Sequence, residues 1–201
     1  VGLAVSRSVF GPWERKDSPI LPTRPGKFDS FLTSNPAPCV HEDGSVLLIY
    51  KARRYEGNVH GRMTIGAARA AHYDGPYRVV GENPVFPPET FHIEDPFVWR
   101  TAEGYELIAK DMDGNLCGEK HGGIHARSAD GLNWKLAERP RAYSRTVTWD
   151  DGTAQTMGSL ERPFLLFQDG KPTHLCAAVA DGPGGFQRAS ETWNMVIPIA
   201  P

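Results

Sequence analysis

The sequence predicts an all-β protein, and three observations support that prediction. Short apolar runs alternate with turns rich in glycine and proline, which number 21 and 17 of the 201 residues. Asp-Gly pairs stand between apolar runs, as they do in β-hairpins. No stretch repeats its apolar residues with the 3.6-residue period of an amphipathic helix, so we expect almost no helix.

One sequence template occurs three times, over residues 34–52, 93–111 and 160–178. Each copy has a polar residue, a proline, a short apolar strand, a turn ending in glycine and a second apolar strand. The turns are Glu42-Asp43-Gly44, Ala102-Glu103-Gly104 and Gln168-Asp169-Gly170. Each copy therefore predicts one β-hairpin.

A second template alternates with the first, over residues 1–16, 65–80 and 123–138. In each copy a strand of small residues leads to a glycine-containing turn, an aromatic residue and an outer strand. The aromatic residues are Trp13, Tyr77 and Trp134. Two hairpins per repeat make a four-stranded antiparallel sheet, and sheets repeated in this way are the blades of a β-propeller.

The spacing of the repeats indicates long loops and an incomplete ring. The prolines that open the strands recur about every 60 to 67 residues, longer than the roughly 40–45 residues of a WD40 blade. Loops at 53–62, 81–92, 112–122 and 139–159 take up the excess, and long loops in compact domains commonly carry function.

The number of blades predicts how the chain is organised. Blades start near residues 34, 93 and 160, a blade ends over 1–16, and 192–200 is the last strand. This set does not close a ring of the usual four to eight blades. We therefore expect residues 1–201 to be a single domain, a partial five-bladed β-propeller that lacks its N-terminal blades. A three-sheet β-solenoid and an irregular sandwich are the alternatives.

Charge and cysteine content exclude several classes of partner. The formal net charge is -2 and no block of lysine and arginine occurs, so neither nucleic acid nor an anionic membrane surface is an expected partner. The apolar runs are shorter than the roughly 20 residues of a membrane helix. Cys39, Cys117 and Cys176 form no CxxC pair and are odd in number, which argues against a zinc site and a disulfide scaffold. No cofactor is expected. The sequence indicates neither a compartment nor an oligomeric state.

Polar residues stand directly before the strand that opens each repeat. They are Asn35, Glu94, Asp95, Glu161 and Arg162. The first strand of every propeller blade lines the central channel, so these side chains are expected to converge at its mouth. Carboxylates brought close together push one another's pKa values apart, which separates acid from base roles.

Local roles are the alternative for the same carboxylates. Glu94 and Asp95 could cap a turn before Pro96. Glu161 could form an ion pair with Arg162 or Arg145.

The blade starts resemble those of known enzymes. "IEDPFVW" (93–99) looks like the blade-start motif of five-bladed β-propeller glycoside hydrolases, such as families 43, 32, 62 and 117. "LERPFLL" (160–166) is similar to the blade start that carries the acid glutamate in families 43 and 32. "FDSFLTSNPAP" (28–38), with "GPW" (11–13), resembles bacterial family 43-like or sucrase-like proteins.

The resemblance implies hydrolysis of an O-glycosidic bond in an oligo- or polysaccharide. Glu161 matches the general acid and Asp95 the aspartate that tunes the pKa of the acid, and Glu94 is the third catalytic candidate. The base of these families is an aspartate on the first blade, which has no match here, although Asp29 could substitute for it. The chain alone is therefore expected to be inactive.

Further residues are expected to bind the carbohydrate. Asn35 suits a sugar hydroxyl, Arg145 an anionic sugar or phosphate, and Trp99, like Trp193, either stacks on a sugar ring or packs in the core. His125 resembles the proposed acid of family 117, or is a strand histidine satisfied by its neighbours. The full set is Asn35, Asp29, Arg162, His125, Lys110, Asp111, Glu119, Arg145 and Trp99.

Three alternatives concern other chemistry. Glu119, His121 and His125 could bind a metal, but their spacing matches no standard zinc or EF-hand pattern, so no metal is expected. A glycoside phosphorylase resembling family 130 would hold phosphate with Arg162, Arg145 and His121. A sugar-binding propeller without catalysis would use the same funnel.

Overall fold

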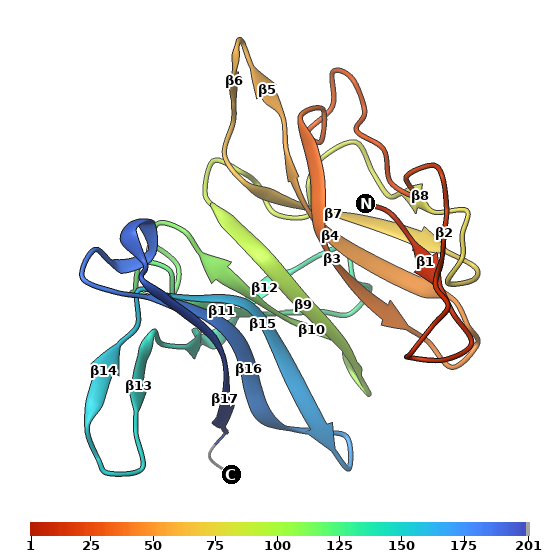
Figure 1. Cartoon of the computed structure of the whole chain (residues 1–201). Coiled ribbons are helices and arrows are strands. Elements are labelled where there is room, and N and C mark those ends of the chain that lie inside the picture. Colours follow the sequence, from red (N-terminus) through yellow and green to blue (C-terminus); the bar gives the residue numbers. More distant parts are fainter. Residues whose placement is uncertain (200–201) are drawn as a thin grey trace.

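The computed structural model describes residues 1–199, and these residues form an all-β fold, as the sequence predicts. Three antiparallel sheets fan out from their first strands (Figure 1). Within the described residues the helical content is one 3-10 turn, Gly185–Arg188. No helix in this range is long and apolar enough to cross a membrane.

The three sheets follow the predicted hairpins. The first sheet contains β3 (Leu32–Val40), β4 (Val46–Arg53), β7 (Thr64–Ala70) and β8 (Arg78–Val79). The second contains β9 (Ile93–Thr101), β10 (Gly104–Asp111), β11 (Gly123–Ser128) and β12 (Lys135–Tyr143). The third contains β15 (Ser159–Gln168), β16 (Lys171–Asp181) and β17 (Glu191–Pro198).

The third sheet and two of the loops differ from prediction. The described part of the third sheet has three strands rather than four. The last predicted strand, 192–200, is β17 as far as Pro198; residue 199 is not in the strand, and residue 200 lies outside the described residues. The predicted loops 53–62 and 139–159 contain two-stranded ribbons, and β12 continues to Tyr143. The ribbons in the chain are β1 (Ala4–Val5) with β2 (Glu14–Arg15), β5 (Tyr55–Glu56) with β6 (Val59–His60), and β13 (Thr146–Thr148) with β14 (Ala154–Thr156).

The sheets pack face to face through apolar side chains. Leu47 and Ile65 of the first sheet meet Leu107 and Ile124 of the second in one buried cluster. A second cluster joins the second and third sheets. The opposite face of the first sheet is covered by the segment around Leu21. This face-to-face packing around a common axis is that of propeller blades, so the solenoid and sandwich alternatives do not apply.

A backbone irregularity recurs at the start of each sheet. Asn35, Asp95 and Arg162 each precede a proline and have φ angles of 46°, 54° and 55°. The pairing register of β3, β9 and β15 with the next strand shifts at the same place. Such bulges turn side chains away from the regular alternation of a strand. Three strained non-glycine residues at matching positions make this end of the first strands the candidate for a functional site.

Candidate active site

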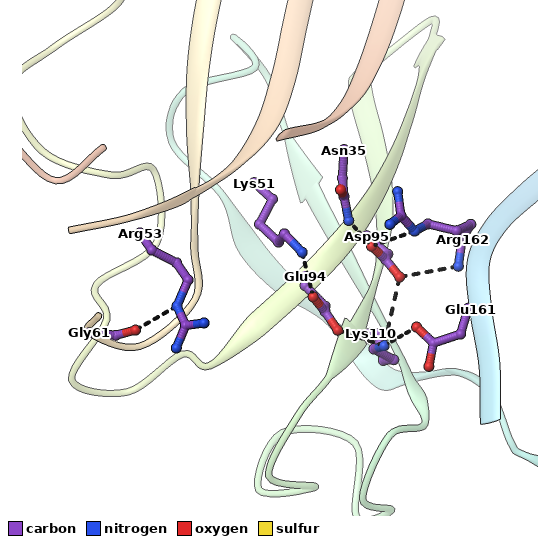
Figure 2. A network of polar contacts seen from close by, with 9 residues as sticks. All are labelled: Asn35, Lys51, Arg53, Gly61, Glu94, Asp95, Lys110, Glu161 and Arg162. Atoms are coloured by element: carbon purple, nitrogen blue, oxygen red, sulfur yellow. Dashed lines mark hydrogen bonds and ion pairs between the residues drawn. The ribbon is translucent and has the colours of Figure 1, made fainter. Parts of the chain in front are cut away.

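The side chains before the three prolines converge, as the repeat predicts. Asp95 lies at the centre and is buried. The side-chain amide of Asn35 donates a hydrogen bond to its Oδ1. The backbone N–H of Arg162 donates to its Oδ2 over 3.2 Å, and Arg162 Nε lies 3.4 Å from its Oδ1. One residue from each sheet therefore takes part in a single polar network (Figure 2).

A buried lysine joins the three carboxylates of this network. The Nζ of Lys110 lies 2.6 Å from Glu94 Oε1 and 3.7 Å from Asp95 Oδ2, and it also donates a hydrogen bond to Glu161 Oε2. One carboxylate oxygen from each of Glu94, Asp95 and Glu161 lies within 4.8 Å of the other two. Figure 2 shows the three carboxylates pointing toward the lysine. The alternative of an ion pair between Glu161 and Arg162 or Arg145 is not what the structure has, because the basic partner of Glu161 is Lys110.

Exposure distinguishes the three carboxylates. The Glu161 side chain is 21% exposed, whereas those of Glu94 and Asp95 are 10% and 1% exposed. Glu161 is thus the member of the cluster that a ligand can reach. The Arg162 side chain beside it is 62% exposed and is also accessible.

Lys51 completes the network, and sequence reasoning missed it. Its Nζ lies 2.8 Å from Glu94 Oε2. Lys51 pairs with Ser34 on β3 as Lys110 pairs with Glu94 on β9, so the two lysines occupy equivalent positions in their sheets. "LLIYKA" (47–52) and "ELIAKD" (106–111) carry the signal, a lysine at the end of an apolar second strand. In the third sheet Ala178 takes this place.

The environment moves the pKa values of two glutamates in opposite directions. Burial acts to raise the pKa of Glu94, but the charges and hydrogen bonds of Lys110 and Lys51 outweigh it and hold the pKa below its usual value. Burial raises the pKa of Glu161, and the nearby Asp95 carboxylate adds to that effect against the opposing pull of Lys110. Glu94 is therefore the ionised partner of the lysines, and Glu161 is the carboxyl group that retains a proton more readily.

Tyr143 on β12 and His121, in the loop between β10 and β11, border the network. Burial, together with the charges of Asp95 and Glu161, holds the pKa of Tyr143 well above its usual range. The hydroxyl of Tyr143 is buried and has no hydrogen-bond partner among residues 1–199. His121 has a left-handed backbone, with φ at 64°, and burial followed by Lys110 lowers its pKa. No pattern in the sequence distinguishes Tyr143 from a core aromatic residue.

The structure contradicts the role expected of Asp29. Its side chain is completely buried. Arg24 Nε donates to both carboxylate oxygens, at 3.0 and 2.9 Å, and the Tyr50 hydroxyl donates to Oδ2 at 2.9 Å. These contacts hold the segment before β3 against the first sheet. Asp29 is therefore a structural residue and is neither a base nor a sugar ligand.

Three further candidates hold loops in place. Asp111 is buried and accepts backbone hydrogen bonds from the loop that follows it, including those of Leu116 at 2.8 Å and Gly114 at 2.9 Å. Glu119 accepts a hydrogen bond from the Arg145 backbone N–H at 2.9 Å. The Arg145 guanidinium donates to the carbonyls of residues 120, 157 and 158. Both carboxylate oxygens of Asp111 are occupied in this way, so its expected contact with substrate is wrong. Substrate binding by Glu119 and Arg145 stays a prediction.

Trp99 and His125 lie elsewhere. Trp99 is four residues beyond Asp95 on β9, packs against the core between the second and third sheets, and stacks on the His125 ring at 6.0 Å. His125 Nε2 lies 2.9 Å from Glu106 Oε2. They line a cavity of about 620 Å³ between these sheets, away from the carboxylate cluster. These contacts fit the alternative that His125 is a strand histidine satisfied by its neighbours.

Two other cavities are relevant to a ligand. One of about 380 Å³ lies at the convergence of the first strands and is lined by Asn35, Asp95, Arg162 and the prolines that follow them. A larger one, of about 1100 Å³, lies between the loops at 25–30, 54–62 and 82–89. The smaller cavity is the better candidate because Asp95 and Arg162 of the network line it. The larger cavity contains none of the predicted site residues.

Comparisons with known proteins identify the fold. No protein-family model matches the sequence, and no curated protein matches it. The chain superposes on Zg3597, a family 117 glycoside hydrolase of the marine bacterium Zobellia galactanivorans, with a TM-score of 0.60 at 19% identity over 98% of this chain. A solved glycoside hydrolase matches all of the chain with a TM-score of 0.65 at 14% identity. A thermostable family-43 glycoside hydrolase matches 98% of it with a TM-score of 0.61 at 14% identity.

This chain matches only part of each of these solved proteins. The chain spans 50%, 56% and 61% of the length of the three solved proteins. Sequence identities this low show the fold alone. The chain therefore shares its β-propeller fold with glycoside hydrolases of families 117 and 43.

Proposed function

We propose that this protein is a glycoside hydrolase that cleaves O-glycosidic bonds of an oligo- or polysaccharide at the carboxylate cluster. The observation that supports this proposal is the state of Glu161. It is the accessible carboxyl group among three that meet around Lys110, and its environment raises its pKa. A raised pKa favours the protonated form of a carboxyl group, which is the form that general acid catalysis of glycoside cleavage uses.

The proposed mechanism assigns roles to the residues of the network. Glu161 donates its proton to the oxygen of the leaving group as the glycosidic bond breaks. Asp95, held by Asn35 and Arg162, places a negative charge beside Glu161 that favours the protonated form. The exposed guanidinium of Arg162 and the amide of Asn35 line the small cavity and bind sugar hydroxyls there.

The catalytic base is a separate part of the proposal. The other two carboxylates of the cluster are buried and paired with lysine or arginine, which disfavours either of them as the group that activates water. The solved glycoside hydrolases extend well beyond the part that this chain matches. We infer that further blades complete the ring and contribute the base, and that residues 1–201 alone bind sugar without turnover.

The proposal is tested on the full-length protein that contains this chain. Neutral and acidic oligosaccharides are incubated with it in phosphate-free buffer and in phosphate buffer, and the products are separated chromatographically. We expect hydrolysis without phosphate and a loss of about 10²–10⁴ in rate for Glu161→Gln. Turnover that requires phosphate would identify a phosphorylase, and binding without turnover would identify a sugar-binding propeller; either result overturns the proposal. The hydrogen bonds that already occupy Arg145 argue against a phosphate site.

A further inference from the structure

The ammonium group of Lys110 occupies the position that a bound cation takes in many carboxylate sites. Its side chain is 4% exposed, and it contacts carboxylate oxygens of Glu94, Asp95 and Glu161. Three carboxylates this close repel one another strongly unless a positive charge lies between them. In this protein a side chain supplies that charge, and a metal ion would have to displace it.

Glu94 links Lys110 to a second lysine. Its Oε1 lies 2.6 Å from Lys110 Nζ and its Oε2 lies 2.8 Å from Lys51 Nζ. Both oxygens of Glu94 are thus committed to lysines that come from β10 and β4. This bridge fixes the ammonium of Lys110 from one side, while Glu161 approaches it from β15 on the other.

We propose that Lys110 is a positioning residue that holds the carboxyl group of Glu161 at the mouth of the site and sets its acid strength. The proposal rests on the proposed function of Glu161 as the proton donor. Burial and Asp95 both favour a protonated Glu161, and the ammonium favours the ionised form. Without Lys110, Glu161 would retain its proton to higher pH and would be a weaker acid toward a leaving group.

Charged and titratable groups from the neighbouring elements face the pair formed by Lys110 and Glu161. Tyr143 stays neutral because its pKa is raised, and His121 favours the neutral form because burial and Lys110 lower its pKa. The charged neighbours are the ones already placed in the network. They are Glu94 and Asp95 from β9, Lys51 from β4 and Arg162 from β15, with Arg145 close to His121.

The test is a titration of Glu161 that needs no substrate. Protein labelled with ¹³C in the glutamate carboxyl carbons is followed by NMR from pH 3 to 9, and Glu161→Gln assigns the signal. We expect Lys110→Met to raise the pKa of Glu161 by about one unit or more, a roughly tenfold gain in proton affinity. Lys51→Met is the matched control, because Lys51 contacts Glu94 but not Glu161; its effect on the pKa of Glu161 should be less than half as large.

A second variant keeps the test possible if Lys110→Met does not fold. Lys110→Met leaves Glu94 buried beside a single lysine, so Glu94→Gln/Lys110→Met removes the ion pair as a unit and keeps its volume. The proposal is overturned if the pKa of Glu161 stays within about 0.2 unit of wild type in whichever of these variants folds.

The pH profile of the full-length enzyme separates this inference from the proposed function. An acid that must be protonated loses activity as pH rises through its pKa. We expect the basic limb of kcat/KM to move to higher pH in parallel with the titration. If the pKa of Glu161 shifts in Lys110→Met but the basic limb of kcat/KM does not move, the role of Lys110 is supported and Glu161 is not the acid. If the pKa of Glu161 does not shift, the role of Lys110 itself is contradicted.

Discussion

Glu94 and Glu161 show how neighbours decide the role of a carboxyl group. Each stands two residues before the proline of its blade start, and each contacts Lys110. Glu94 also has Lys51, while Glu161 faces Asp95 and has Ala178 opposite it in place of a lysine. The same residue type at matching positions therefore has a lowered pKa in one blade and a raised pKa in the next.

Neutralising these two glutamates should change stability in opposite directions. Glu94 has a lowered pKa when folded, so its charge stabilises the protein above its ordinary pKa of 4.5, and this contribution is lost as pH falls through the folded value. Glu94→Gln should lower the free energy of unfolding by about 3 kcal/mol at pH 7. Glu161 has a raised pKa, so its ionisation favours the unfolded protein as pH rises above the ordinary value of 4.5, and Glu161→Gln should raise the free energy of unfolding at pH 7.

Urea denaturation at pH 7 and pH 3.5 measures both effects. The deficit of Glu94→Gln should shrink at the lower pH, because below pH 4.5 the unfolded wild-type protein takes up a proton at Glu94 before the folded protein does. A Glu161→Gln protein that is less stable than wild type at pH 7 would contradict the account of its environment.

The blade-start strands carry the geometry that brings these residues together. At Asn35, Asp95 and Arg162 the backbone is left-handed just before a proline, where non-glycine residues are strained. The bulge turns consecutive side chains toward the same edge, so one strand delivers both Glu94 and Asp95. Strain repeated three times is maintained by the hydrogen bonds that meet at Asp95.

Substitutions at Asn35 separate the strain from the hydrogen bond. Asn35→Gly removes the contact with Asp95 but suits a φ of 46°. Asn35→Val removes the same contact and adds a β-branched side chain, which costs about 1–2 kcal/mol more in this conformation. Denaturation curves should therefore place Asn35→Val below Asn35→Gly by that amount. Equal stability of the two would show that the backbone at this position is not left-handed.

The sequence predicted the hairpins well because their signals are local. Asp169 and Gly170 both have positive φ angles, 52° and 74°, as an Asp-Gly turn between apolar runs requires. The ribbons β5–β6 and β13–β14 were missed because strands of two or three residues show no alternation. The pattern around Asp29 suggested function, but its role depends on Tyr50, a contact made only when the chain folds.

The site was predicted only in part, because some of its residues have local sequence signals and others are recognised only by contacts made in the folded chain. The repeat register placed Asn35, Asp95, Glu161 and Arg162 at one edge, which the structure shows. Predicting that Lys51 belongs to the site would have required an alignment of the second strands of the repeats as well as of the first strands. Asp111, at the end of β10, and Arg145, after β12, border polar loops that look like ligand-binding segments, and only the backbone groups around them reveal that they hold those loops.

At the scale of the whole molecule, the third sheet differs from the others in having an uncovered apolar face. Phe164, Leu166 and Val196 lie on that face and are exposed, whereas the first and second sheets are covered on both faces. The packing between the other sheets shows how a further blade would cover it. A contiguous apolar face of this kind drives association in water.

This face predicts self-association of the 201-residue chain when it is prepared alone. Leu166→Lys/Val196→Lys should reduce the weight-average mass measured by sedimentation velocity at a given concentration, because charges on the face oppose its burial. Val59→Lys is the control, since Val59 is exposed on β6, away from this face. Association that responds equally to both changes would contradict a specific role for the third sheet.

Glu161 is proposed to give a proton to the leaving group. The most direct test is how the cleavage rate of the Glu161→Gln variant of the full-length enzyme depends on the acidity of the leaving group. Aryl glycosides of the preferred sugar are compared, with leaving phenols that range from weakly to strongly acidic. A strongly acidic phenol departs without help from an acid, so Glu161→Gln should cleave its glycoside at close to the wild-type rate. On an alkyl glycoside of the same sugar, whose leaving group must be protonated, the rate of the variant should fall by a factor of about 10²–10⁴. Equal losses on both substrates would show that Glu161 is not the proton donor.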